Sequence, residues 1–191
     1  DWRVVYGYGH TPANAALLAD DGLLVSGDHV LPTIYPNISV WWGWIDNPLR
    51  DYLESLDHFA TLPVTLALPS HGPLFRDVPE RIAEIRRFHR RRLERTLAFC
   101  ANEPRTAYES IVAVVNKPSV SPVIALIAGQ VLATLAWLEG EGCIERVEDH
   151  PLRFRARPGA QALLDARFAD VAADAATETA PGAADDEESS H

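Results

Sequence analysis

At 191 residues and 47% hydrophobic content, the chain is long enough to bury a core, and we expect a soluble globular protein of one domain or two small ones. Its formal net charge of -10 arises largely from an acidic tail beyond residue 165, so the charge does not indicate an acidic folded domain. The two cysteines, Cys100 and Cys143, lie far apart, which argues against a disulfide framework and against a zinc-thiolate site, and favours the cytoplasm.

The first strand is predicted at residues 2–8, where bulky and β-branched residues alternate before a Gly-Tyr-Gly loop. Two short apolar runs at 15–18 and 23–25 flank Asp21-Gly22, a dipeptide that supplies the positive φ of a hairpin turn. Residues 31–48 contain three prolines and three tryptophans, so we expect an irregular excursion of the kind that often forms the wall of a site.

A helix is predicted at 48–62, a short buried strand at 64–68 and a long helix at 79–100, each from the spacing of its apolar residues. This alternation of strands and helices indicates an α/β layer architecture for residues 1–102.

A second unit is predicted at 103–160, with helices at 106–115 and 122–141 followed by strands at 143–147 and 152–156. Two helices and a β-hairpin are the outline of a small winged-helix-like α+β domain. The second helix is apolar along most of its length, with Gly129 and Gln130 as interruptions, so it is expected to be packed in a core and neither to cross a membrane nor to enter a nucleic-acid groove. Residues 161–191 are expected to be partly helical and then disordered beyond about residue 172.

Three segments each place a metal-ligating side chain in a loop directly after a predicted strand. They are Gly-His-Thr-Pro at His10, Ser-Gly-Asp-His at Asp28 and Ser-His-Gly-Pro at His71. Imidazole and carboxylate groups suit zinc, manganese or iron, and a carboxylate has two oxygens with which to bridge two cations. One such segment alone is usually a simple turn, but the three together predict a metal site.

These segments resemble, in order, the third, fourth and fifth metal-binding motifs of metallo-β-lactamase-fold hydrolases. The resemblance implies the second half of an αββα sandwich, with His10 at metal site one, Asp28 as the catalytic bridging ligand and His71 at site two. It also implies two divalent metals, zinc in the first place with manganese or iron as alternatives. Asn14 stands where many relatives have a histidine that is not a ligand, which suggests a supporting role for this position.

Residues 105–157 resemble the winged-helix extension of glyoxalase II relatives and of lactamase-like endoribonucleases. The His-x-His-x-Asp-His motif that begins the family's catalytic domain has no counterpart in this chain, so we expect the chain to be amino-terminally truncated.

The resemblance implies a hydrolase in which a metal-bound hydroxide attacks an ester-like substrate: a thioester, a lactone or a phosphodiester. Small-molecule esters and thioesters are our first expectation and RNA is the second, with no membrane partner and with a homo-oligomer left open. The alternative is a non-catalytic binding or interaction protein, for nucleic acid among other partners, because half the ligands of a two-metal site are absent from the chain.

Further residues carry weaker signals. Tyr35, Asn37 and Trp41 are candidates for a substrate pocket, although capping of the core or a subunit contact is an equally good interpretation. His29 is expected to point away from Asp28, its neighbour on an extended chain. Three other histidines are expected to be solvated: His58, His89 and His150.

The long helix carries six arginines: Arg86, Arg87, Arg90, Arg91, Arg92 and Arg95. A basic helix face can bind nucleic-acid phosphates. The interpretation that we favour is a solvated face whose arginines pair with Glu80, Glu84 and Glu94.

Overall fold

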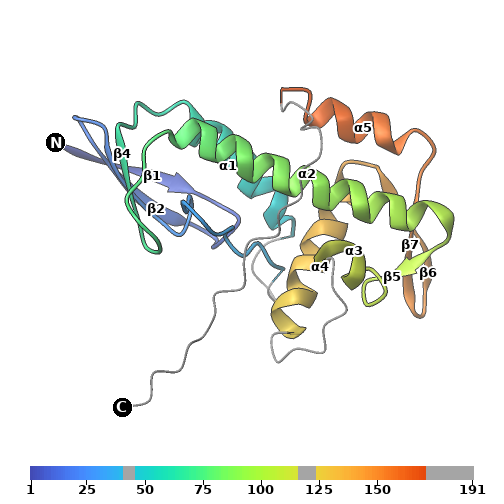
Figure 1. The fold of residues 1–191 in the computed structure, drawn as a ribbon. Helices are drawn as coiled ribbons and strands as arrows, with labels where there is room; N and C mark the ends of the chain where they lie inside the picture. Colours follow the sequence, from blue (N-terminus) through green and yellow to red (C-terminus); the bar gives the residue numbers. More distant parts are fainter. Residues whose placement is uncertain (41–45, 116–123, 171–191) are drawn as a thin grey trace, which may run out of the picture.

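The computed structural model describes residues 1–40, 46–115 and 124–170, and Figure 1 shows two small sheets joined by one long helix. The first sheet contains β1 (Trp2–Gly7), β2 (Asn14–Ala19), β3 (Leu23–Gly27) and β4 (Leu66–Pro69), in that spatial order. The pairs β1/β2 and β2/β3 are antiparallel, whereas β3 and β4 are parallel and are connected through α1 (Pro48–Ala60). The predicted hairpin turn is confirmed between β2 and β3.

One face of this sheet is covered and the other is not. The covered face carries Val5, Ala16, Leu18, Leu24 and Ala67, all of them buried. The opposite face carries large exposed apolar side chains: Trp2, Val4, Tyr6, Leu17 and Val25. A sheet that is apolar on both faces and has helices on only one of them fits the predicted half of an αββα sandwich.

Helix α1, which covers this sheet, begins and packs as its sequence predicts. At the start of α1 the Asn47 side chain accepts a hydrogen bond from the Arg50 amide, and Pro48 occupies the first turn. The α1 face that is buried carries the predicted set of Leu49, Tyr52, Leu53, Leu56 and Phe59. The long helix α2 (Val78–Asn102) matches the predicted helix to within two residues at either end.

His89 lies in the core, so the prediction that it is solvated is wrong. Its side chain is 1% exposed, and its position four residues after Ile85 and four before Leu93 places it within the buried stripe of α2. Neither ring nitrogen has a hydrogen-bond partner among the described residues. Burial, followed by the nearby charge of Arg92, lowers the pKa of His89 well below its ordinary value. His58 and His150 are exposed, as predicted.

We expect this buried imidazole to make the protein sensitive to acid. Because the pKa of His89 is lowered in the folded state, the unfolded chain takes up the proton first, and stability falls as the pH drops below the ordinary imidazole pKa of 6.5. At about pH 5.5, one unit below that value, protonation of this single group in the unfolded chain lowers the free energy of unfolding by about 1.4 kcal/mol relative to neutral pH. The free energy of unfolding, measured with urea, should therefore be lower at about pH 5.5 than at about pH 7.5. In His89→Leu this difference should be smaller by the contribution of His89. His58→Leu, on the exposed side of α1, keeps the buried imidazole and serves as the control; an unchanged difference in His89→Leu would contradict the prediction.

The second sheet has the order β5-β7-β6 and is built from β5 (Arg105–Thr106), β6 (Ile144–Asp149) and β7 (Leu152–Ala156). Three helices accompany it: α3 (Ile111–Val115), α4 (Ile124–Gly140) and α5 (Ala160–Arg167). The predicted hairpin is confirmed, and so is the helix after residue 160. The winged-helix assignment and the domain boundaries stay predictions, and the expected disorder beyond residue 172 lies outside the described residues.

The helix predicted at 106–115 is confirmed only over its second half. Thr106 pairs with Arg153 at the edge of the second sheet, so the segment begins as a strand. The Glu109 carboxylate then accepts a hydrogen bond from the Thr106 amide at 2.7 Å, and the Thr106 hydroxyl accepts one from the Glu109 amide at 3.1 Å. This reciprocal pair is a capping box, which closes a turn before α3 begins.

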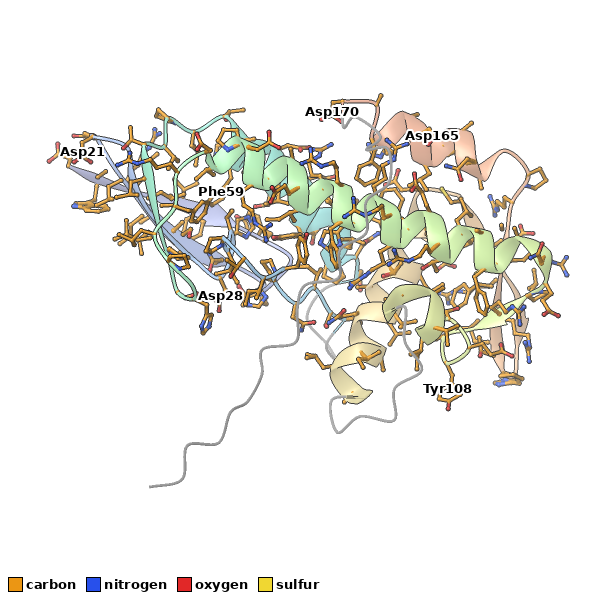
Figure 2. The ribbon with its side chains drawn as sticks, in the orientation of Figure 1. Asp21, Asp28, Phe59, Tyr108, Asp165 and Asp170 are labelled. Carbon is orange, nitrogen blue, oxygen red and sulfur yellow. The ribbon has the colours of Figure 1, made fainter. Side chains whose placement is uncertain are left out.

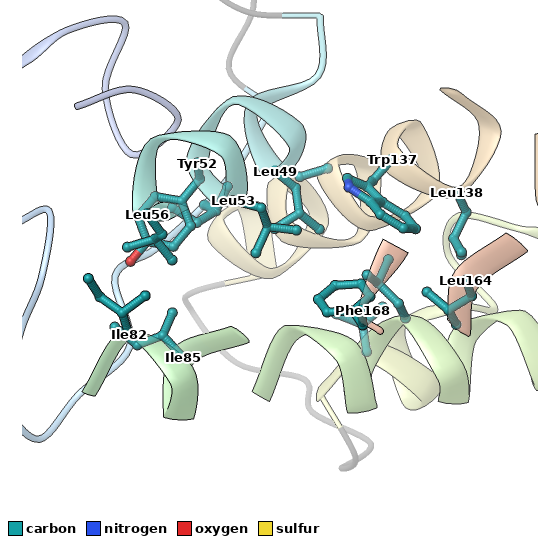
Figure 3. Packing of buried hydrophobic residues seen from close by; sticks show 14 of the residues in the cluster. Leu49, Tyr52, Leu53, Leu56, Ile82, Ile85, Trp137, Leu138, Leu164 and Phe168 are labelled. Carbon is teal, nitrogen blue, oxygen red and sulfur yellow. The ribbon is translucent and has the colours of Figure 1, made fainter. Parts of the chain in front are cut away.

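A single hydrophobic cluster joins the two sheets. Helix α2 contacts α1, α3, α4, α5 and β7. Figure 3 shows Trp137 of α4 beside Phe168 and Leu164 of the last described segment, close to Leu49 and Leu53 of α1. The two ring centroids of Trp137 and Phe168 are 5.9 Å apart. Within the described ranges no helix is long and apolar enough to span a membrane.

The arginine face of α2 pairs with carboxylates. Arg87 bonds to Glu80 and Arg90 to Glu94, as predicted, whereas Glu84 bonds to Arg81, which is not one of the six predicted arginines. The side chains of Arg86, Arg87 and Arg90 are only 11%, 19% and 16% exposed, so the prediction of a solvated face is wrong for them. Arg86 forms further ion pairs with Asp57 and with Asp170. These contacts are those of a salt-bridged helix face.

Candidate metal centre

The strand directions bring the three predicted ligands to one edge of the first sheet. Because β1 and β3 are both antiparallel to β2, they run in the same direction, and β4 runs parallel to β3. The carboxyl ends of β1, β3 and β4 therefore meet at one edge, where His10, Asp28 and His71 follow these strands. In Figure 2, Asp28 lies at the end of the sheet opposite the Asp21 turn.

Asp28 lies between the two histidines, and each histidine faces a different carboxylate oxygen. The distance from His10 Nε2 to Asp28 Oδ2 is 3.6 Å, and the distance from His71 Nε2 to Asp28 Oδ1 is 3.5 Å. Side-chain exposure increases along the group, from 22% at His10 through 37% at Asp28 to 66% at His71. The arrangement therefore opens to solvent on the His71 side.

Hydrogen bonds between neighbouring loops hold Asp28 in place. The Ser70 amide donates to the Gly27 carbonyl at 3.1 Å, which ties the β4 loop to the β3 loop, and the Ser70 hydroxyl donates to Asp28 Oδ1. On the other side, the Asn14 side-chain amide donates to the Ser26 carbonyl at 3.3 Å. Asn14 thus supports the strand end that carries Asp28.

His10 is oriented by the loop that follows Asp28. Its Nδ1 lies 2.9 Å from the Asn37 carbonyl oxygen. Since a carbonyl oxygen can only accept a hydrogen bond, Nδ1 carries the proton, and the lone pair of Nε2 is directed to the side of Asp28. This is the tautomer that a metal-ligating imidazole requires.

His29 points away from this edge into the core, as predicted. Its ring contacts Phe59 and Tyr52 of α1, and its Nε2 lies 2.9 Å from the Ser55 hydroxyl. The Tyr52 hydroxyl donates to the His29 carbonyl at 2.9 Å. Burial, together with the nearby His10, lowers the pKa of His29 to about 4, so the ring is neutral near pH 7. His29 therefore anchors the backbone next to Asp28.

The candidate pocket residues lie in the loop after Asp28. The Tyr35 ring stacks on Phe88 of α2 at 3.9 Å between centroids, and the Arg81 guanidinium lies 4.9 Å from the centroid of the Tyr35 ring. Asn37 accepts the His10 bond with its backbone, while its side chain bonds to Ser39 and Gln130. Trp41 lies outside the described residues. A contact of Tyr35, Asn37 or Trp41 with substrate stays a prediction.

Two residues of this site were missed from the sequence. Gln130 stood out only as a polar interruption of an apolar helix, and Ser70 only as part of the motif around His71.

The structure brings the three predicted ligands together but does not show a complete metal site. In the portion of the chain that the structure describes, no group of three or more His, Cys, Asp or Glu side chains has the geometry to hold a metal ion by itself. A nitrogen-oxygen-nitrogen donor set with a central carboxylate nevertheless fits divalent zinc, manganese or iron chemically.

The described residues form a mixed α/β protein with His10, Asp28 and His71 at one edge of the first sheet. Solved structures with a similar fold are known. No family model and no curated protein matches the chain. A beta-lactamase domain protein from Burkholderia ambifaria is 40% identical with a TM-score of 0.77, over 82% of this chain and 48% of that one. A metallo-beta-lactamase family protein from Thermus thermophilus is 32% identical with a TM-score of 0.73, over 82% of this chain and 49% of that one.

The chain belongs to the metallo-β-lactamase superfamily, as the resemblance of its three motifs implied. It spans about half the length of these two relatives.

Proposed function

We propose that this chain is part of a metal-dependent hydrolase that acts on an ester-like substrate. In this proposal His10 is a ligand of the first metal, His71 is a ligand of the second, and Asp28 bridges both. The remaining ligands would come from the part of the relatives that the chain does not span. Zinc is the proposed metal, with manganese or iron as alternatives.

The observation that supports the proposal is the division of the Asp28 carboxylate between two histidines. Oδ2 faces His10 Nε2 and Oδ1 faces His71 Nε2, so two cations bound by the two nitrogens would each find a separate carboxylate oxygen. This division suits a carboxylate that bridges two cations through its two oxygens, and an ordinary ion pair at the end of a sheet does not require it.

Divalent cations bound at this edge would supply Lewis acidity, which activates water and polarises a carbonyl or phosphoryl oxygen. The chain's own residues prepare the centre for them. The Asn37 carbonyl holds the proton of His10 on Nδ1, and the Ser70 hydroxyl fixes the Asp28 oxygen that faces His71. Loop contacts thus hold the donor atoms in position before a metal arrives, which reduces the entropy lost on binding.

The proposed substrates are small-molecule thioesters or lactones, because activated water attacks a polarised acyl group without a side-chain nucleophile. An RNA phosphodiester is the second substrate class. The exposed side chain of His71 leaves that side of the centre open to solvent, which suits access by a substrate of either class.

A non-catalytic binding protein is the alternative. It is favoured by the finding that the described residues alone do not complete a metal site. The two proposals differ in what they require of Asp28, because only the hydrolase needs its carboxylate for metal binding.

The test is the metal content of the purified protein after equilibration with zinc and removal of free metal. Asp28→Asn keeps the size of the side chain and removes the negative charge, and Asp20→Asn, at the opposite end of the sheet, is the matched control. We expect the unaltered protein and Asp20→Asn to retain zinc and Asp28→Asn to lose at least nine tenths of it. Equal zinc in both variants would favour the binding protein over the hydrolase.

A further inference from the structure

Helix α4 lies far from the metal ligands in sequence, yet it contacts the loop that orients His10. The Val40 amide donates to the Gly129 carbonyl at 3.0 Å, and the Asn47 side chain donates to the Ala136 carbonyl at 3.2 Å. The approach at Gly129 is so close that an added Cβ would lie 2.8 Å from Ser39 Cβ. Glycine at this position therefore allows the helix backbone to touch the loop.

Within this contact, Gln130 makes the shortest side-chain hydrogen bond to the loop. Its amide nitrogen donates to Asn37 Oδ1 at 2.7 Å, and the Ser39 hydroxyl donates to the same oxygen at 3.0 Å. Both bonds are partly buried, where an unpaired amide oxygen would be costly. The two donors thus fix the conformation of Asn37.

The backbone carbonyl of the same residue accepts the Nδ1 proton of His10 at 2.9 Å. A short chain of hydrogen bonds therefore runs from Gln130 through Asn37 to His10, whose Nε2 lies 3.6 Å from Asp28 Oδ2. Each link belongs to a different segment: α4, the loop after β3, the loop after β1 and the end of β3.

We propose that Gln130 is a positioning residue for His10, through Asn37, so that helix α4 of the second unit sets the geometry of the first metal position. The consequence for metal binding rests on the proposed function; the consequence for the His10 tautomer does not. Gln130 touches neither metal nor substrate in this proposal. It keeps the Asn37 carbonyl where it holds the imidazole proton on Nδ1.

The first experiment measures the tautomer of His10 without any metal. Long-range proton-nitrogen correlation spectra of the nitrogen-15-labelled protein, recorded near pH 8, distinguish an Nδ1 proton from an Nε2 proton. We expect a single Nδ1-H form in the unaltered protein and a mixture of both forms in Gln130→Ala. Gln161→Ala, which removes an exposed amide donor on α5, should leave the His10 spectrum unchanged. A single unchanged tautomer in Gln130→Ala would overturn the proposal.

The second experiment measures cobalt affinity by competition with a chelating dye, using Gln130→Ala, Asn37→Ala and the double variant. Loss of an outer hydrogen bond to a metal-ligating histidine typically weakens binding by about 10-fold to 100-fold. We expect each single variant to lose roughly 10-fold and the double variant to lose no more, because both changes break the same chain of bonds. Independent losses that multiply to roughly 100-fold would show that Gln130 does not act through Asn37.

The two experiments separate this inference from the proposed function. If the unaltered protein binds no cobalt, the ligands on this chain do not hold the metal alone, and the tautomer spectra still decide the positioning role. If the unaltered protein binds cobalt and Asp28→Asn does not, but Gln130→Ala is normal in both experiments, only the positioning role is wrong.

Discussion

Gly9→Ala is expected to lower the free energy of unfolding by about 3 to 4 kcal/mol. Gly9 has a φ of +99°, a conformation that residues with a side chain rarely adopt. A Cβ at this position would also lie 2.4 Å from the Pro48 carbonyl oxygen and 2.4 Å from Tyr52 Cβ. Neither neighbour can move freely, because Pro48 begins α1 and Tyr52 is fully buried. Relief of the clash would therefore require α1 or the loop that carries His10 to shift.

Urea unfolding followed by circular dichroism measures this loss, and Gly142→Ala is the matched control. Gly142 also has a positive φ, +73°, but nothing lies within 4 Å of the Cβ that alanine would add. Backbone strain alone should cost the control about 1 kcal/mol. The difference between the two variants isolates the clash with α1; equal losses would mean that only the backbone conformation matters at Gly9. Reduced metal binding by folded Gly9→Ala would further link this contact to the position of His10.

Local sequence patterns were sufficient for the parts of the molecule that depend on neighbouring residues. The strands of the first sheet, the Asp21-Gly22 turn and the apolar face of α1 follow from periodicity and turn chemistry, and all three are confirmed, the strand ends to within two residues. The three metal-ligand candidates were found because each lies in a short motif directly after a strand. Their meeting at one edge follows from the strand directions, which no single motif contains.

What the sequence did not reveal depends on contacts between distant segments. His89 was assigned to the surface by its polarity, although its spacing from Ile85 and Leu93 already placed it in the buried stripe. The strand at Thr106 exists only because β7 lies beside it, and the role of Gln130 depends on a loop more than ninety residues earlier, at Asn37. Periodicity describes one element at a time, so it cannot identify which polar residue of α4 faces another segment.

Replacement of Arg81 is the second change for which we expect a large loss in the free energy of unfolding. The guanidinium group of Arg81 holds the loop between Asp28 and Asn37 onto α2. Its Nε donates to the Leu31 carbonyl at 2.7 Å, and one of its terminal nitrogens donates to the Ile34 carbonyl at 2.9 Å. The same group bonds to Glu84 at 2.7 Å and covers the Tyr35 ring. Arg81→Leu leaves two loop carbonyls without their donor at a buried position, so we expect a loss of about 3 kcal/mol in the free energy of unfolding.

Arg81→Lys and Arg76→Leu make this prediction specific. A lysine ammonium group retains the charge but cannot reproduce the planar fork that reaches three acceptors, so Arg81→Lys should lose about 2 kcal/mol. Arg76 also donates to a backbone carbonyl, that of Thr65, but in an exposed position where water replaces the lost bond, and its loss should stay below about 0.5 kcal/mol. The free energy of unfolding of the three variants is measured with urea. If Arg81→Lys were as stable as the unaltered protein, charge alone would hold the loop, and this account would be wrong. If instead the lysine variant is destabilised and also binds zinc more weakly, the fork of Arg81 and the amide of Gln130 hold the two ends of one loop whose Asn37 carbonyl orients His10.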